Sequence, residues 1–140
     1  MKGLYKNLTE LLPSLKDIEF GKWYPEKQPG DGSREHPLRM PFVVHSDVVK
    51  QLIKEVYRFE EEHQEYGLNQ YLQILKKYDI EWSDEAMVGA DVSRMDGQGV
   101  MALLLAAIRA ERFCDGALLH FLEEGCIQKW LERLVELDIE

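Results

Sequence analysis

The sequence predicts a mainly α fold, a single compact helical domain of five or six helices around a central apolar helix. Apolar residues recur at helical spacing along most of the chain. Four of the five prolines fall together in residues 19–41, which predicts a long loop rich in proline, glycine and aromatic residues, with at most a minor extended segment. The 140 residues, 45% of them hydrophobic, suit one domain over residues 1–140 with its own core.

Residues 1–18 are expected to form an N-terminal helix. Pro13 lies inside this segment, where it removes a backbone donor and clashes with the carbonyl four residues earlier, so we expect a kink or a break there. The leucines of the segment share one helical face. They are Leu4, Leu8, Leu11, Leu12 and Leu15.

Residues 19–45 are expected to form an ordered loop. Trp23 and Tyr24 are large side chains that gain by burial, so they would fasten this loop onto the helical body. The sequence GDGS at 30–33 suits the tip of the loop. PFVVHS, residues 41–46, predicts a short extended piece, and one strand forms no sheet alone.

Residues 46–140 are expected to form the helical body. Ser46 is a suitable N-cap for a long helix that ends before Gly67. A second amphipathic helix is expected over residues 68–80. Ser83 can then cap a short helix that ends near Gly89.

The apolar run at residues 100–108 is expected to form the central helix, because a helix that is apolar on most sides requires burial on most sides. Asp96 can cap this helix. Asp115 can cap the next one, which Gly125 would end. A last helix is predicted over residues 126–138. Its inward residues are Ile127, Trp130, Leu131 and Leu134.

The net charge of −9 is unevenly distributed along the chain. Residues 1–45 carry seven basic and six acidic residues, whereas residues 46–140 carry ten basic and twenty acidic residues. Direct binding of nucleic acid is not expected, because nucleic-acid-binding proteins concentrate Lys and Arg. An acidic face can engage a basic protein, although solubility alone also explains such charge. The expected acidic interaction surface consists of Glu60, Glu61, Glu62 and Glu65.

The two cysteines and the N-terminus indicate the compartment. Cys114 and Cys126 are twelve positions apart with no second pair, which fits neither a disulfide framework nor a zinc ribbon. The N-terminus lacks the apolar segment of a secretory leader, and the longest wholly apolar run is nine residues, too few to span a bilayer. We therefore expect a soluble cytoplasmic protein without membrane contact.

Apolar and charged residues near the C-terminus follow a distinctive order. The positions concerned are Arg109, Glu111, Arg112, Phe113, Cys114, Asp115, Gly116, Gly125, Trp130, Arg133 and Leu134. This order resembles the C-terminal signature of the DUF6508 family of small uncharacterised bacterial, archaeal and phage proteins. FGKWYP and PFVVHS also look like the family's Trp-containing loop and the apolar segment after it, so the resemblance spans about residues 20–137. It implies a shared fold and carries no catalytic activity to this chain.

The charged junction after the apolar run is the candidate binding site. Guanidinium groups suit small anions and carboxylates, so Arg109, Arg112 and neighbouring loop residues can form a pocket for one. The alternative is structural: Arg112 pairs with Asp115 or Glu111 and ties two helix ends together. The binding candidates are Trp23, Tyr24, His36, Arg39, Arg109, Glu111, Arg112 and Asp115.

Catalytic and metal-binding patterns are weak in this sequence. His120 and Glu124 are spaced to share a helix face, but a metal site requires a third ligand, so no metal is expected. No cofactor motif and no known nucleophile motif is found. A helix start can favour the Cys114 thiolate, yet we expect Cys114 to act as a small buried apolar residue.

Three functions remain open. The first, which the sequence favours, is a noncatalytic protein-interaction or binding module of unknown partner. The second is a phage or mobile-element inhibitor that engages a basic nucleic-acid-binding protein through its acidic surface. The third is a small enzyme or anion-binding protein that uses the junction of residues 109–115. The oligomeric state is left open.

Overall fold

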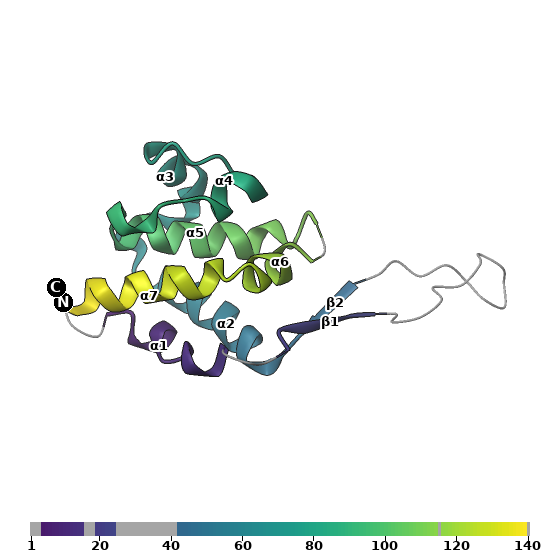
Figure 1. Cartoon of the computed structure of the whole chain (residues 1–140). Coiled ribbons are helices and arrows are strands. Elements are labelled where there is room, and N and C mark those ends of the chain that lie inside the picture. The colour runs from purple at the N-terminus through teal and green to yellow at the C-terminus, as the bar shows by residue number, and fades with distance from the viewer. Residues whose placement is uncertain (1–3, 16–18, 25–41, 115, 140) are drawn as a thin grey trace, which may run out of the picture.

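The segments with periodic hydrophobic residues form helices, and these helices pack around one central helix, Gly97–Ala110 (Figure 1). The computed structural model describes residues 4–15, 19–24, 42–114 and 116–139. Within these residues the α-helices number seven, rather than five or six, and the strands two. The helices are α1 (Lys6–Thr9), α2 (Asp47–Glu62), α3 (Tyr71–Lys77), α4 (Asp84–Val88), α5 (Gly97–Ala110), α6 (Ala117–Glu123) and α7 (Cys126–Ile139). The strands are β1 (Gly21–Tyr24) and β2 (Phe42–His45). The predicted mainly α single domain is confirmed.

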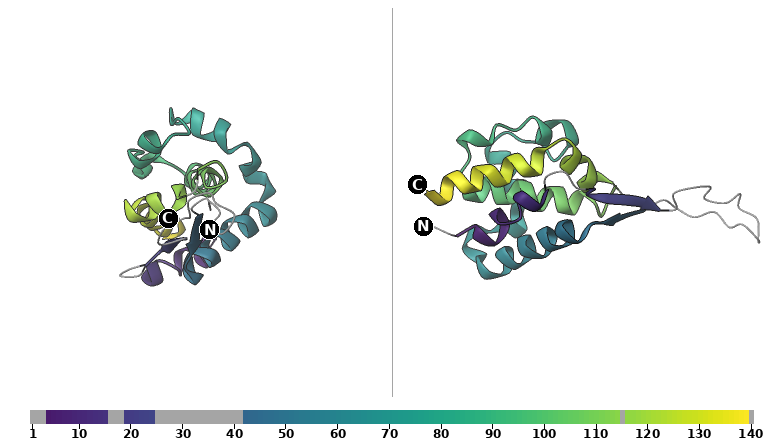
Figure 2. Two further views of the ribbon diagram at one scale, coloured as in Figure 1. Left: turned by 90° about the vertical axis from the view of Figure 1, so that its right-hand side faces the viewer. Right: turned by 60° about the horizontal axis from the view of Figure 1, so that its bottom comes forward.

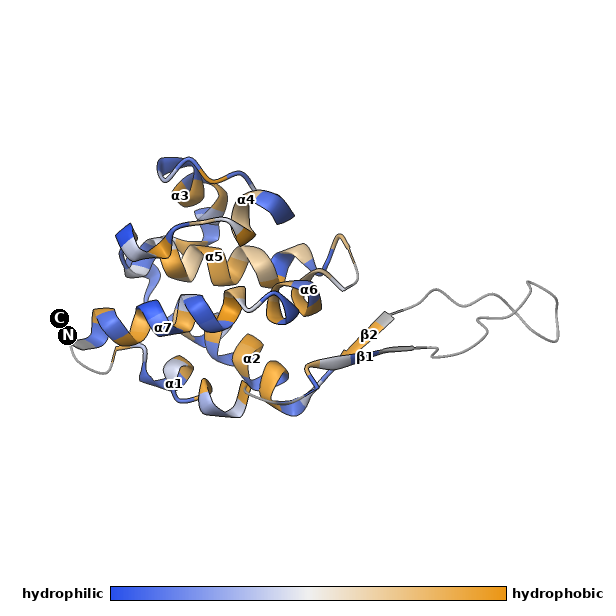
Figure 3. Ribbon diagram, viewed as in Figure 1, coloured by the Kyte–Doolittle hydropathy of each residue, from blue (hydrophilic) through white to orange (hydrophobic). Residues whose placement is uncertain are grey.

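Helix α5 contributes the largest continuous part of the core. Every residue from Val100 to Ala107 is 0% exposed, because this helix is apolar around its whole circumference. It packs against α2, α3, α6 and α7. The end-on view of Figure 2 shows the other helices curving around α5. In Figure 3, α5 is apolar along most of its length, whereas α2 and α7 alternate between polar and apolar residues.

Caps define where the central helices begin. Asp96 accepts hydrogen bonds from the backbone amide of Gly99 at 2.9 Å and from the hydroxyl of Tyr78 at 2.7 Å, as expected for the cap of α5. Ser83 accepts from the amide of Ala86 at 3.2 Å, and the short helix α4 ends at the residue before Gly89, as predicted. Ser46 occupies the N-cap position of α2, but its side chain forms no capping bond.

The N-terminal segment is less helical than predicted. Helix α1 covers only four residues, and a 3-10 turn at Pro13–Leu15 follows it. The expected break at Pro13 therefore occurs, and the predicted N-terminal helix is shorter than expected within residues 4–15, while residues 1–3 and 16–18 lie outside the described part of the chain. Leu8 and Leu15 are nevertheless buried. The amide of Tyr5 donates to the Asp138 carboxylate at 3.1 Å, which joins this segment to α7.

A two-stranded antiparallel hairpin projects from the helical body (Figures 1 and 2). Its register pairs Gly21 with His45 and Trp23 with Val43. The sequence predicted the second strand but placed the first inside a loop over residues 19–45. That prediction was wrong for β1, because its partner lies about twenty residues away and local patterning cannot reveal such pairing.

None of the described helices is both long enough and apolar enough to cross a membrane.

The C-terminal helix α7 follows the sequence expectation closely. Its inward residues Ile127, Trp130, Leu131 and Leu134 are all buried. Gly125 precedes α7 with a φ of 81°, a left-handed conformation that glycine adopts without strain and that ends α6.

Candidate functional site

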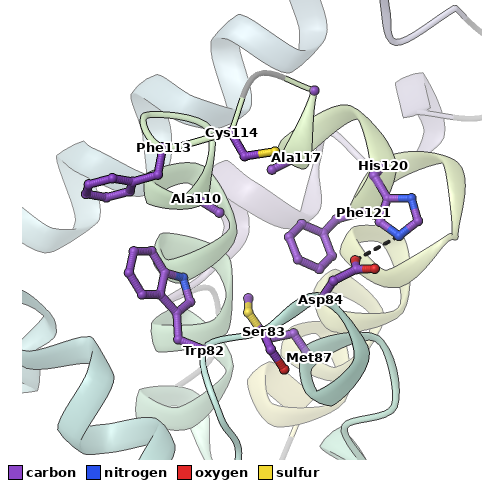
Figure 4. Close-up of a pocket in the computed structure, with 11 residues that line it drawn as sticks. Trp82, Ser83, Asp84, Met87, Ala110, Phe113, Cys114, Ala117, His120 and Phe121 are labelled. Carbon is purple, nitrogen blue, oxygen red and sulfur yellow. Dashed lines mark ion pairs between the residues drawn. The ribbon is translucent and has the colours of Figure 1, made fainter.

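A pocket of about 490 Å³ opens on the surface between α4, the turn after α5, and α6 (Figure 4). This volume lies within the range of sites that hold a small molecule or a large side chain. Its buried wall is apolar and includes Met87 and Phe121. Ala110 and Ala117 also line it, and these short side chains leave the space open.

Two aromatic side chains form one end of the pocket (Figure 4). Trp82 is 37% exposed and Phe113 is 78% exposed, and their rings meet edge to face with centroids 5.5 Å apart. The Trp82 ring is held in place, because its Nε1 donates to the carbonyl of Ala106 at 3.1 Å and it packs edge to face on Tyr71. Phe113 thus projects from the body beside a fixed aromatic wall.

Local backbone geometry explains why Phe113 is outside the core. Helix α5 ends at Ala110, whose carbonyl accepts from the amides of Phe113 and Cys114 at 3.1 and 3.0 Å. Gly116 has a φ of 93° and redirects the chain into α6. Residues 111–114 turn away from the end of α5, and Arg112, Phe113 and Cys114 are exposed there.

The other end of the pocket is polar (Figure 4). His120 Nε2 lies 2.8 Å from Asp84 Oδ1, and this contact joins α6 to the first residue of α4. Ser83, which also lines the pocket, uses its hydroxyl to cap α4. His120 and Asp84 therefore pair with each other, and the Ser83 hydroxyl is used by the Ala86 amide, so the remaining surface offered to a ligand is mainly apolar.

Cys114 lines the pocket and is exposed, so the expectation that it is a small buried residue was wrong. The physical reason is the turn after α5, which carries residue 114 out of the core. Cys126, in contrast, is buried. Burial raises the pKa of its thiol, and the nearby Glu124 carboxylate raises it further. Both thiols are free.

Glu111 has a structural role at the charged junction. Its carboxylate accepts hydrogen bonds from the amide of Gly116 at 3.0 and 3.1 Å and from the amide of Leu118 at 3.0 Å. It therefore caps the start of α6, the role expected of Asp115. Asp115 itself lies outside the described residues.

The two arginines of the junction do not converge on the pocket. The Arg109 guanidinium lies 5.5 Å above the ring of Tyr57, and its buried Nε has no hydrogen-bond partner among the described residues. Arg112 is exposed, and the predicted ion pair between Arg112 and Glu111 is absent among the described residues. Neither arginine lines the pocket.

Four of the candidate residues belong to the predicted loop. The backbones of Trp23 and Tyr24 lie in β1, while their side chains are outside the described part of the chain. His36 and Arg39 are outside it altogether. The predicted convergence of these residues with Arg109 stays a prediction.

The predicted acidic surface lies at the end of α2 and just beyond it. Glu61, Glu62 and Glu65 are exposed, whereas Glu60 is partly buried. Glu62 pairs with Arg58 at 3.4 Å. Glu65 is bonded to its own backbone amide and to His63, and these bonds hold the pKa of its carboxyl below the ordinary value. A polar hollow of about 600 Å³ lies beside Glu60 and Glu61.

His120 and Glu124 are four residues apart, a spacing that suits two metal ligands. His120 contacts Asp84 instead. Within the described part of the chain, no three His, Cys, Asp or Glu residues gather in a way that would hold a metal ion.

Arg133, part of the distinctive C-terminal order, donates from Nε to the carbonyl of Met95 at 3.1 Å and so joins α7 to the turn before α5.

The pocket was missed in the sequence, because Trp82 was assigned no role and Phe113 was used only as part of the distinctive C-terminal order. The sequence neighbours of these residues give no clear signal, because Phe59 also lies between two charged residues, Arg58 and Glu60, and is buried.

Comparison with protein families confirms the resemblance seen in the sequence. Residues 4–140 match the family described as "Family of unknown function (DUF6508)". The match covers nearly the whole chain and so exceeds the expected span of residues 20–137. Comparisons with curated proteins and with solved structures gave no match. The pocket geometry is therefore the main guide to function.

Proposed function

The chain belongs to the DUF6508 family, and we propose that it is a noncatalytic protein-interaction module that receives an apolar side chain of a partner in the Trp82–Phe113 pocket. The observation that carries this proposal is the 78% exposure of Phe113 beside an apolar hollow. Exposing a phenylalanine to water is unfavourable, and grouped exposed apolar residues are typical of interaction sites.

The construction of the pocket suits a protein partner. Interface hot spots combine a rigid aromatic residue with a hollow that an anchoring side chain can fill. Trp82 supplies the rigid wall, because its indole is fixed by the carbonyl of Ala106. Phe113 extends beyond the hollow and adds contact area for residues on either side of the anchor.

The alternatives receive less support. A small enzyme or anion-binding protein at residues 109–115 requires free charged groups, whereas Glu111 is engaged in capping α6 and neither arginine lines the pocket. A phage or mobile-element inhibitor that binds a basic protein through its acidic surface is compatible with the exposed Glu61 and Glu62, yet no large apolar residue lines the neighbouring hollow except Tyr57 and Leu68. We also propose a cytoplasmic setting, because two free thiols suit a reducing compartment.

A displayed library of random peptides tests the proposal. We expect the intact chain to select peptides that share an aromatic or large aliphatic residue. In ¹⁵N-labelled protein, a selected peptide should shift the amide signals of α4, α6 and the turn between α5 and α6. Replacing the anchor residue of the peptide by alanine should weaken binding by about tenfold or more, as expected for a hot spot.

Matched variants localise the binding. Phe113→Ala removes an exposed apolar side chain of the pocket, and Leu72→Ala removes an exposed one on α3 away from it. We expect Phe113→Ala, and the pocket-filling variant Ala117→Trp, to weaken binding while Leu72→Ala does not. Amide shifts located on α2 or the hairpin, or equal effects of Phe113→Ala and Leu72→Ala, would refute the proposal.

A further inference from the structure

We propose that the segment of the partner that enters the Trp82–Phe113 pocket is basic, with Lys or Arg next to its apolar anchor and lying over α4. This inference rests on the proposed function and adds the charge of the partner to it. It also fixes the orientation of the bound segment, because the two sides of the pocket differ in charge.

Carboxylates are concentrated in the segment that forms the α4 side of the pocket: Asp84 lines the pocket, and Glu81 and Glu85 are next to lining residues in the sequence. Glu81, Asp84 and Glu85 lie within five consecutive residues around Trp82 and are all exposed. In the described part of the chain, none of the three forms an ion pair with a lysine or an arginine, and the single charged contact among them is that of Asp84 with His120. Their negative field is therefore available to a cation bound beside the pocket.

The turn on the opposite side of the pocket carries an exposed arginine, which does not itself line the pocket. Arg112 is exposed and directly precedes Phe113 in the turn after α5. A basic residue of the partner is repelled there and attracted at α4. The apolar anchor thus enters the hollow beside the paired rings of Trp82 and Phe113, and the flanking cation extends toward Glu81 and Glu85.

Charge on the whole chain favours a basic partner over a second copy of the same protein. The whole chain carries a net charge of −9. Residues 46–140, which form both walls of the pocket, carry a net charge of −10. Two such bodies repel each other, whereas a cationic segment is drawn in and its association is accelerated. We therefore do not expect two copies of the chain to associate through Phe113.

The selected peptides provide the test. We expect Lys or Arg to be enriched within a few residues of the apolar anchor, and the dissociation constant to rise by about tenfold between low and high salt because the ionic contacts are exposed. The double variant Glu81→Lys/Glu85→Lys should raise the dissociation constant by about tenfold and remove most of the salt dependence.

The matched control is Glu61→Lys/Glu65→Lys, which changes the net charge equally at the end of α2 and just beyond it. We expect it to change binding much less than the α4 double variant does. Equal effects of the two double variants, peptides without enriched basic residues, or a sedimentation experiment showing a dimer that Phe113→Ala abolishes would each overturn the inference. If Phe113→Ala still weakens the binding of neutral peptides, the proposed function stands and only the basic partner is wrong.

Discussion

Glu111, the residue directly after α5, accepts a hydrogen bond from the amide of Leu118 in the first turn of α6, at 3.0 Å. The amide of Gly116 donates to the same carboxylate. The first amides of a helix have no partner within that helix, and a carboxylate there is also favoured by the helix dipole. One side chain therefore fixes the angle between two helices and, with it, the turn that presents Phe113.

Replacing Glu111 should destabilise the fold without touching the pocket lining. We expect Glu111→Ala to lower the free energy of unfolding by about 1–2 kcal/mol, because the α6 amides lose their acceptor. Glu111→Gln keeps one acceptor oxygen and should cost less. Urea unfolding followed by circular dichroism measures both changes. Glu61→Ala, on an exposed part of α2, is the control and should have little effect; equal losses in both alanine variants would contradict the capping role.

Gly97 lies where a larger residue has no room. A Cβ at this position would lie 1.6 Å from the hydroxyl oxygen of Tyr5 and 2.6 Å from the carbon that bears it. Since the Tyr5 hydroxyl also contacts that of Tyr66 at 2.8 Å, it is not free to move without loss. We expect Gly97→Ala to lower the free energy of unfolding by about 1–3 kcal/mol through overpacking.

The matched control for Gly97 is Gly89→Ala. There the nearest atom to an added Cβ is the carbonyl oxygen of Glu85 at 3.4 Å, an ordinary contact. Thermal unfolding should show a clear loss for Gly97→Ala and little change for Gly89→Ala. Combining Gly97→Ala with Tyr5→Phe removes the closest clash, so the double variant should recover part of the loss; no recovery would point to another cause.

The features that the sequence predicted well are those set by local chemistry. The burial of residues 100–107 follows from an apolar surface on every side of the helix, and the caps at Ser83 and Asp96 follow from side chains that bond an amide three residues on. Pro13 likewise interrupts the first helix by its own covalent structure. Each of these depends on neighbours within one or two helical turns.

The features that the sequence missed depend on distant or competing partners. Pairing of β1 with β2 joins segments about twenty residues apart. The capping of α6 by Glu111 was also missed, because its carboxylate reaches from the end of α5 to amides five and seven residues further on; the predicted cap at Asp115 lies outside the described residues. The pocket was missed because its walls come from α4, α5 and α6, which approach one another only after folding.

His45 makes stability depend on pH. Burial lowers the pKa of this imidazole below its ordinary value of 6.5, an effect that Lys50 adds to and the Glu111 carboxylate partly opposes. The unfolded chain therefore binds a proton more readily than the folded one, so stability is full above pH 6.5 and falls as pH decreases through that value. We expect His45→Gln to flatten the change in unfolding free energy between about pH 7.5 and about pH 5. An unchanged slope would contradict this assignment.

The two thiols should differ in reactivity. Cys114 is exposed on the pocket wall, whereas Cys126 is buried and its thiol pKa is raised by that burial. Since the thiolate is the reactive form, iodoacetamide should alkylate Cys114 first and Cys126 only on unfolding. Mass spectrometry of digested protein gives both rates. A peptide that occupies the pocket should slow the labelling of Cys114; equal rates for both cysteines in the native protein would contradict the burial of Cys126.

Phe113 and Phe121 separate the requirements of folding from those of binding, because both line the pocket but only one is buried. Phe121 is 3% exposed and Phe113 is 78% exposed. We expect Phe121→Ala to lower the free energy of unfolding by about 3–5 kcal/mol, since it leaves a cavity in the core. Phe113→Ala loses only an exposed contact with Trp82 and should cost about 1 kcal/mol or less. Urea unfolding of the two variants measures the contrast. A large loss of unfolding free energy in Phe113→Ala would mean that the fold itself requires this side chain. A small loss would leave the binding of a partner as the reason for its exposure.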